Sequence, residues 1–200
     1  MDGVTAIITA AGESTRMGQP KALLQWQGVT LIDYQTTSLL SGGVANVVVV
    51  LGHEAARIEP NYKKLGVQYV VNSNYRQGRS ASIVAGLEKV ESSTTTIMLL
   101  GVDQPRPPSI ITTVLGYHKA NQALITSPRY QGRGGHPLVF SALLRSELET
   151  ITEEHKGIRA LFRTHPNDIA EVPIDDPIVC LDLNTPEEYE TAKNRYGEGL

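Results

Sequence analysis

Residues 4–21 read VTAIITAAGESTRMGQPK, an apolar run that ends abruptly in a loop of small and charged residues. The run from Val4 to Ala11 predicts a buried strand, because a continuous apolar stretch that stops at glycine is typical of a sheet covered on both faces. Small residues at 10–12 let backbone N–H groups approach a ligand closely, and Arg16 and Lys21 add two cations. Backbone amides and cations that follow a first strand predict a phosphate-binding site.

Two familiar phosphate-binding motifs do not fit this loop. A P-loop has four residues between its glycines and a lysine after the second, whereas five residues separate Gly12 from Gly18 and Gln19 follows. A dinucleotide fingerprint has glycine two positions after the first, where this chain has Ser14. On the residues alone, an ordinary surface loop with two solvated cations stays open as the alternative.

The remainder of the chain alternates between strand-like and helix-like patterns. Further strands are expected over 44–52, 67–71, 95–101, 123–126, 137–140, 169–174 and 178–183. Helices are expected over 31–41, 53–60, 80–90, 107–119, 141–150 and 157–163, and from Pro186 onward. This alternation predicts an α/β fold, a three-layer sandwich with a mostly parallel sheet, in one domain over residues 1–200. Ligands of such sheets bind beyond the carboxyl ends of the strands.

Composition excludes several classes of protein. The chain has 200 residues, of which 40% are apolar and 20% charged, and a formal net charge of −3, which disfavours sequence-independent binding of nucleic acid. Cys180 is the only cysteine, so a disulfide framework and a cysteine-based zinc site are excluded. No apolar run approaches the ~20 residues of a membrane span, and the first residues carry Asp2 without a basic flank, unlike a secretory signal. We therefore expect a cytoplasmic protein that binds neither membranes nor nucleic acid.

A resemblance to a known family rests on residues 10–21, which follow the pattern A-A-G-x-S-x-R-M-G-x-x-K. Five more segments match in order: 72–86, 101–105 (GVDQP), 132–140 (GRGGHPLVF), 156–159 and 181–189 (LDLNTPEEY). Together they resemble the nucleotidyltransferases with a Rossmann-like fold, in particular the molybdenum cofactor cytidylyltransferases of the MobA-like NTP transferase family.

The resemblance implies an enzyme of the EC 2.7.7 class that transfers a nucleoside monophosphate to a phosphorylated acceptor and releases pyrophosphate. Ala11, where guanylyl members have glycine, favours CTP, and the implied acceptor is molybdopterin, with a molybdoenzyme or its chaperone as a partner. Alternatives are a transferase for a sugar phosphate or another small phosphorylated acceptor, and a noncatalytic nucleotide-binding domain. A Rossmann oxidoreductase is a further alternative, which the glycine spacing disfavours.

The same resemblance implies roles for individual residues. Catalysis is assigned to Arg16, Lys21 and Asp103. Nucleotide binding is assigned to Thr9, Ala10, Ala11, Gly12, Ser14, Arg16, Gly18, Lys21, Gly78 and Ser82. Binding of Mg²⁺ is assigned to Asp103 with Asn184, or with Asp182 in its place, and acceptor binding to His136, Arg133 and Arg159. Arg79 departs from the methionine that is usual in the family.

Several of these residues can also be explained by a structural role alone. Asp103 before Gln104-Pro105 is typical of a turn, and the 182–185 segment resembles a helix cap. Arginines on loops are commonly solvated, and His136 can simply occupy a turn. We interpret Trp26 and Cys180 as packing residues. The other histidines, at 53, 118, 155 and 165, are expected at the surface.

Overall fold

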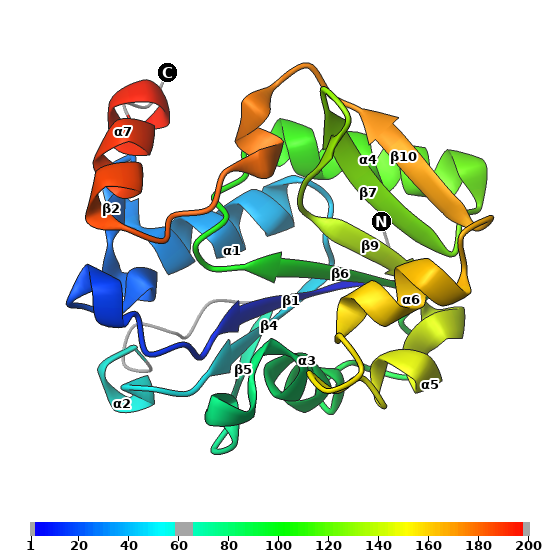
Figure 1. The fold of residues 1–200 in the computed structure, drawn as a ribbon, viewed down its shortest axis with the longest axis horizontal. Coiled ribbons are helices and arrows are strands. Elements are labelled where there is room, and N and C mark those ends of the chain that lie inside the picture. The colour runs from blue at the N-terminus through cyan, green and yellow to red at the C-terminus, as the bar shows by residue number, and fades with distance from the viewer. Residues whose placement is uncertain (1–2, 59–65, 198–200) are drawn as a thin grey trace.

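The computed structural model describes residues 3–58 and 66–197, and its centre is one twisted sheet (Figure 1). Within these residues the sheet has eight strands, ordered β10-β7-β9-β6-β1-β4-β5, with β8 paired to β7. The strands are β1 (Val4–Ala10), β4 (Asn46–Leu51), β5 (Val67–Val71), β6 (Thr96–Gly101), β7 (Ile125–Tyr130), β8 (Arg133–Gly134), β9 (Leu138–Ser141) and β10 (Ile169–Pro173). A separate hairpin is formed by β2 (Gln25–Trp26) and β3 (Val29–Thr30), which the sequence patterns did not predict.

The sheet is mostly parallel, as predicted. β1 lies parallel to both β4 and β6, β4 to β5, and β10 to β7. β9 runs antiparallel to β6 and β7, and its start, Leu138, faces Leu99 near the end of β6. The carboxyl ends of β1, β4 and β6 therefore meet the amino end of β9 at one edge of the sheet.

Helices cover both faces, which confirms the three-layer architecture (Figure 1). One layer contains α1 (Leu31–Ser41) and α4 (Pro108–Asn121), and the other contains α3 (Arg79–Leu87), α5 (Arg145–Leu148) and α6 (Ile158–Thr164). In β4, Val47 and Val49 pack into the first core and Val48 and Val50 into the second, because successive side chains point to opposite faces. This double burial explains why the strand reads as a continuous apolar run.

The last helix, α7 (Pro186–Tyr196), begins with a capping box in which Thr185 and Glu188 bond each other's backbone N–H groups. The hydroxyl of Tyr189 donates to the carbonyl of Gln25 at 2.6 Å, which holds α7 against the β2–β3 hairpin. Residues 182–184, which lead into α7, are thereby carried to the sheet edge where β1 and β6 end.

Some sequence predictions were wrong. Residues 178–183 do not form a strand: Pro177–Cys180 is a 3₁₀ turn, capped by Asp176, and an irregular segment follows. Their apolar residues Ile178, Val179 and Leu183 are buried in the core rather than in the sheet. His118 is buried, not at the surface, and its Nδ1 lies 2.8 Å from the Thr126 hydroxyl.

Other boundaries shifted. Over 141–150 the structure has a 3₁₀ turn, Ala142–Leu144, followed by the short α5. The expected helix over 53–60 is α2 (Ala55–Ile58), and positions 59 and 60 lie outside the described residues. Trp26 is buried and Cys180 packs against the core, as interpreted from the sequence. Among the described residues, no helix is long and apolar enough to cross a membrane.

Candidate active site

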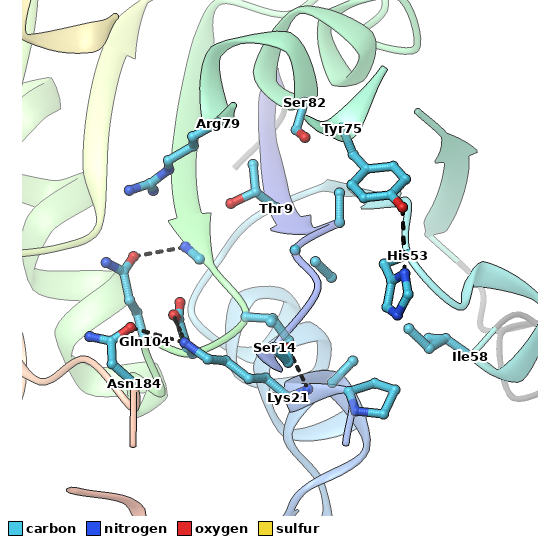
Figure 2. Close-up of a pocket in the computed structure, with 18 of the residues that line it drawn as sticks. Thr9, Ser14, Lys21, His53, Ile58, Tyr75, Arg79, Ser82, Gln104 and Asn184 are labelled. Carbon is cyan, nitrogen blue, oxygen red and sulfur yellow. Dashed lines mark hydrogen bonds and ion pairs between the residues drawn. The ribbon is translucent and has the colours of Figure 1, made fainter. Parts of the chain in front are cut away.

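A cavity of about 420 Å³ opens where β1, β4 and β6 end (Figure 2). Residues from six segments of the chain line it: Thr9, Ala10, Ala11, Gly12, Ser14, Pro20, Lys21, Ala22, His53, Ile58, Tyr75, Gly78, Arg79, Ser82, Gly101, Val102, Asp103, Gln104, Asp182 and Asn184. The cavity thus brings together most of the nucleotide-binding and metal-binding residues proposed from the sequence. Arg16 and Gly18 are exposed on the loop and do not line it.

Lys21 is the charged centre of the cavity. Its Nζ donates to Asp103 Oδ2 at 2.7 Å and to Asn184 Oδ1 at 3.0 Å (Figure 2). The three residues come from the loop after β1, the loop after β6 and the segment before α7. Two oxygen atoms from distant segments therefore converge on one positive charge.

The loop that carries Lys21 is shaped by residues with positive φ. Ser14 (φ 51°) and Gly18 (φ 67°) flank a 3₁₀ turn, Thr15–Met17, and the Lys21 backbone N–H donates to Ser14 Oγ at 3.3 Å. Ala11 is buried, and its carbonyl accepts from the His53 backbone N–H at 3.1 Å. A β-carbon at Gly52 would lie 2.8 Å from the Ala11 Cβ, so the two loops pack too closely for a side chain at position 52.

The opposite wall of the cavity is formed by the start of α3. Asn72 Nδ2 donates to Ser82 Oγ at 3.1 Å, which fixes the Ser82 hydroxyl at the wall. A β-carbon at Gly78 would lie 2.4 Å from Cγ of Glu153, and Gly78 has φ 104°, so only glycine fits there. His53 and Tyr75 complete this side, with the Tyr75 hydroxyl 3.4 Å from His53 Nδ1. Neither residue was singled out as a site residue from the sequence, because no pattern connects two loops 22 residues apart.

Buried polar side chains hold the Asp103 loop in place. Gln35 of α1 donates through Nε2 to the carbonyls of Gly101 and Gln104, at 3.0 and 2.5 Å. Gln104 is 4% exposed, and its Oε1 accepts from the Gly101 N–H at 2.7 Å. Its Nε2 contacts Asp182 Oδ1 at 2.7 Å and His136 Nδ1 at 3.0 Å.

Arg106 is a fully buried cation, and the partners of its side chain among the described residues are main-chain carbonyls. Its guanidinium donates to the carbonyls of Pro105, His136, Val179 and Leu181 at 2.8–2.9 Å. Burial lowers the pKa of Arg106 to about 10, so it keeps its charge at neutral pH, assisted by nearby Asp182. By fixing Val179 and Leu181, Arg106 determines the path of the chain into residues 182–184, which explains why 178–183 is not a strand.

A second cavity, of about 880 Å³, lies beside the first, and Arg79 lines both. Cationic side chains surround it, and apolar side chains also line it. The cations are Arg79, Arg129, Lys156, Arg159 and Arg163; the apolar residues are Ile83, Leu99, Leu138, Ile158 and Phe162. Of the three residues assigned to acceptor binding from the sequence, His136 and Arg159 line this cavity, whereas Arg133 is exposed on β8 and does not.

The electrostatics of this region follow from desolvation. Burial, with the charges of Arg79 and Arg106, lowers the pKa of His136 to about 3, so its imidazole is neutral at physiological pH. Desolvation also lowers the pKa of Arg79, although its side chain keeps contact with solvent, and Asp103, Asp182 and Glu153 oppose that shift. The pKa of Glu153 is lowered because its carboxylate accepts from the backbone N–H and the hydroxyl of Ser80.

The donor set near Lys21 fits a hard divalent cation. Asp103 and Asn184 offer two oxygens directed at one positive centre, the arrangement that Mg²⁺ or Mn²⁺ uses when phosphates and water complete its shell. Among residues 3–58 and 66–197, no three His, Cys, Asp or Glu side chains form a metal cluster, so an all-protein cage is not present there. Asn184 converges with Asp103 on Lys21 Nζ, whereas Asp182 contacts Gln104, so the geometry pairs Asn184 with Asp103.

The fold and the cavity define a nucleotidyltransferase of the Rossmann-like type. The chain belongs to the family of MobA-like NTP transferase domains, which matches residues 6–169. It is therefore related to the molybdenum cofactor cytidylyl- and guanylyltransferases.

Three relatives align over nearly the whole chain. The nicotine blue oxidoreductase of Paenarthrobacter nicotinovorans is 32% identical and covers 96% of this chain and 95% of its own. The molybdenum cofactor cytidylyltransferase of Escherichia coli K12 is 28% identical over 99% of this chain and 100% of its own. A probable molybdenum cofactor guanylyltransferase of Bacillus cereus is also 28% identical, over 96% and 97%.

Solved structures agree with this placement. The crystal structure of Rv0371c from Mycobacterium tuberculosis H37Rv superposes with a TM-score of 0.83 at 26% identity, covering 96% of this chain and 97% of that one. A complex of Rv0371c with manganese gives a TM-score of 0.76 at 25% identity, over 94% and 96% of the two chains.

Proposed function

We propose that the protein transfers CMP from CTP to a phosphorylated acceptor of the molybdopterin type and releases pyrophosphate. The observation that carries the proposal is the contact of Lys21 with Asp103 and Asn184 beside a small-residue loop at the end of β1. This combination places a cation, and a carboxylate that could hold a divalent ion, where the phosphates of a nucleotide would lie.

In this reaction an acceptor phosphate oxygen attacks the α-phosphorus, and the bond to the pyrophosphate oxygen breaks. The chain holds the reactants in line and neutralises charge; no covalent intermediate is required. Lys21 and the amides of residues 10–14 face the triphosphate in this proposal, and Arg16, on the exposed loop outside the cavity, would have to turn inward to contact it. Mg²⁺, held by Asp103 and Asn184, would supply further neutralisation of the phosphate oxygens.

The base lies over Thr9–Gly12 in this proposal, against Gly78 and Ser82. Ala11 lines the cavity at the position where guanylyl members of the family have glycine, and its methyl group favours a pyrimidine by leaving less room for the base. Competition binding with Mg²⁺ present tests this: CTP is expected to bind more tightly than GTP, and Ala11→Gly to reduce the difference. Tighter binding of GTP to the wild type would contradict the pyrimidine preference.

The acceptor occupies the second cavity in this proposal. Arg159 and Arg163 have no acidic partner among the described residues, so they are available to anionic groups, while Ile83, Leu138 and Phe162 suit a flat apolar ring. An acidic pterin has both features. A sugar phosphate has no such ring and fits the apolar lining less well.

One experiment distinguishes the proposed transferase from two alternatives, an oxidoreductase and a noncatalytic nucleotide-binding domain. Pyrophosphate release is measured with CTP or GTP against molybdopterin, sugar phosphates and no acceptor, alongside oxidation of a reduced nicotinamide cofactor, because one relative is named an oxidoreductase. We expect pyrophosphate only with a nucleotide and the pterin acceptor present. Nicotinamide oxidation without pyrophosphate would favour an oxidoreductase, and binding of CTP without either reaction would favour a noncatalytic domain.

A further inference from the structure

Gln104 connects the two cavities through a single buried carboxamide. Its orientation is determined by the protein: the Gly101 backbone N–H can only donate, so the atom it meets at 2.7 Å must be the amide oxygen. The amide nitrogen therefore faces both Asp182 Oδ1, at 2.7 Å, and His136 Nδ1, at 3.0 Å. Both of its hydrogens are used.

The consequence for His136 is a fixed tautomer. Because Gln104 Nε2 can only donate, His136 Nδ1 must accept and carries no proton. The neutral ring then bears its proton on Nε2. The charged groups that act on the ring, Arg79 and Arg106, both disfavour a second proton.

The Nε2–H group remains available. His136 lines the acceptor cavity, and its only side-chain hydrogen bond among the described residues is the one to Gln104. The backbone on either side is also held, since the His136 carbonyl accepts from Arg106 and its N–H donates to the Val179 carbonyl at 2.8 Å. The ring thus presents one rigid hydrogen-bond donor to the cavity.

We propose that Gln104 is a positioning residue that locks His136 as the neutral Nε2–H tautomer, so that His136 donates a hydrogen bond to an oxygen of the acceptor, while the same amide holds Asp182 at the nucleotide cavity. The donor role rests on the proposed function, and the tautomer does not. In this arrangement His136 is not a general base: its unprotonated nitrogen faces Gln104, and its other nitrogen already carries a proton.

The tautomer is tested directly by ¹⁵N NMR of histidine-labelled protein without ligand between pH 5 and 8. The His136 signals are assigned by their loss in His136→Asn. We expect protonation at Nε2 only, with no titration across this range. A proton on Nδ1, or a doubly protonated ring at pH 6, overturns the inference.

Gln104→Glu tests the cause of the lock. A carboxylate keeps the acceptor for Gly101, and its second oxygen shares a proton with Asp182 Oδ1, which lies 2.7 Å from the present amide nitrogen. Toward His136 this oxygen then offers only a lone pair, so His136 is expected to become protonated at Nδ1. Gln131→Glu, an exposed residue of the turn after β7, is the matched control and leaves the His136 signals unchanged. If Gln104→Glu unfolds, Gln104→Met serves: it removes the donor, and Nδ1–H is expected to appear alongside Nε2–H. An unchanged tautomer in a folded variant overturns the role of Gln104.

The donor role is tested with His136→Asn, whose short amide can still meet Gln104 but does not reach the cavity. The acceptor KM is expected to rise about two- to tenfold, the value of one neutral hydrogen bond, with the CTP KM unchanged. An unchanged acceptor KM overturns the donor role. Absence of pyrophosphate release with every acceptor, in a wild type that shows the Nε2–H tautomer, overturns the proposed function while supporting the lock.

Discussion

Lys21 Nζ and Asp103 Oδ2 lie 2.7 Å apart although 82 residues separate them in the chain. The contact exists because β1 and β6 are parallel neighbours, so the loops that follow them begin at the same edge of the sheet. Both side chains are shielded, with 15% and 26% of their surfaces exposed. Removing either charge from so shielded a pair is expected to change activity or nucleotide binding. The expected effect differs between Asp103 and Lys21.

Asp103→Asn is expected to lower turnover by at least about 100-fold, because it removes the negative charge that holds a divalent ion against the phosphates. Asparagine keeps an oxygen acceptor for Lys21, so the melting temperature is expected to stay nearly unchanged, and excess Mg²⁺ or Mn²⁺ to restore part of the activity. Pyrophosphate release against metal concentration, beside a melting curve, checks this. Asp175→Asn, at an exposed position, is the control. Early melting of the variant would instead assign Asp103 to the turn.

Lys21→Met is expected to weaken binding of CTP by about ten- to a hundredfold, the value of one charge-assisted contact, and binding of CMP far less. The difference arises because the ammonium faces the distal phosphates in the proposed function. Titration calorimetry of both nucleotides measures it, with Lys89→Met on an exposed surface as the control. Equal losses for the two nucleotides would place Lys21 away from the distal phosphates.

Arg106→Met is expected to reduce the free energy of unfolding by at least about 3 kcal/mol, since four buried carbonyls lose their donor. Chemical denaturation measures the loss, and Arg195→Met, at an exposed position of α7, controls for removal of a positive charge. A loss no larger than that of the control would mean that the carbonyls find other donors.

His136 is expected to make the fold sensitive to acid. Its pKa is about 3 in the folded protein and near its ordinary value of 6.5 when unfolded, so the unfolded state takes up the proton first. The stability contribution is therefore complete above pH 6.5 and is lost as the pH falls from 6.5 toward 3. Denaturation midpoints from pH 7 to 4 should fall less steeply in His136→Asn than in the wild type. His155→Asn, at the exposed position 155, should keep the wild-type slope.

The elements predicted correctly from the sequence are those that a local run of apolar residues determines. The apolar runs at 4–11, 44–52 and 95–101 became central strands because their burial on both faces leaves a continuous signal. The family resemblance also pointed to loop residues that line one cavity, and the fold brings them together because β1 and β6 are parallel neighbours that end at the same edge.

What escaped prediction depends on long-range contacts. Residues 178–183 have the apolar pattern of a strand, but two of their carbonyls accept hydrogen bonds from Arg106 instead of from a neighbouring strand. Hydrophobic periodicity contains no information about such a contact with a buried cation. Gln104, Gln35 and His118 are polar residues with partners up to 78 positions away, so their burial is visible only in the folded chain. Arg133 and Arg159 looked alike as loop arginines, and only the fold shows that Arg159 lines the second cavity and Arg133 does not.

Because β9 runs antiparallel to its neighbours, the segment before it and the loops after β1 and β6 are held by different parts of the sheet. Because β9 enters the sheet from the edge that β1 and β6 leave, the turn at 131–136 reaches the site from the opposite chain direction and stands outside the parallel register of β5, β4, β1 and β6 (Figure 1). Insertions or deletions at 131–135, ahead of the held His136, would change the lining of the second cavity at Gly134 and Gly135 without altering the loops after β1 and β6. In such a sheet one hairpin can change the lining of the second cavity while the parallel strands that carry the first cavity keep their register.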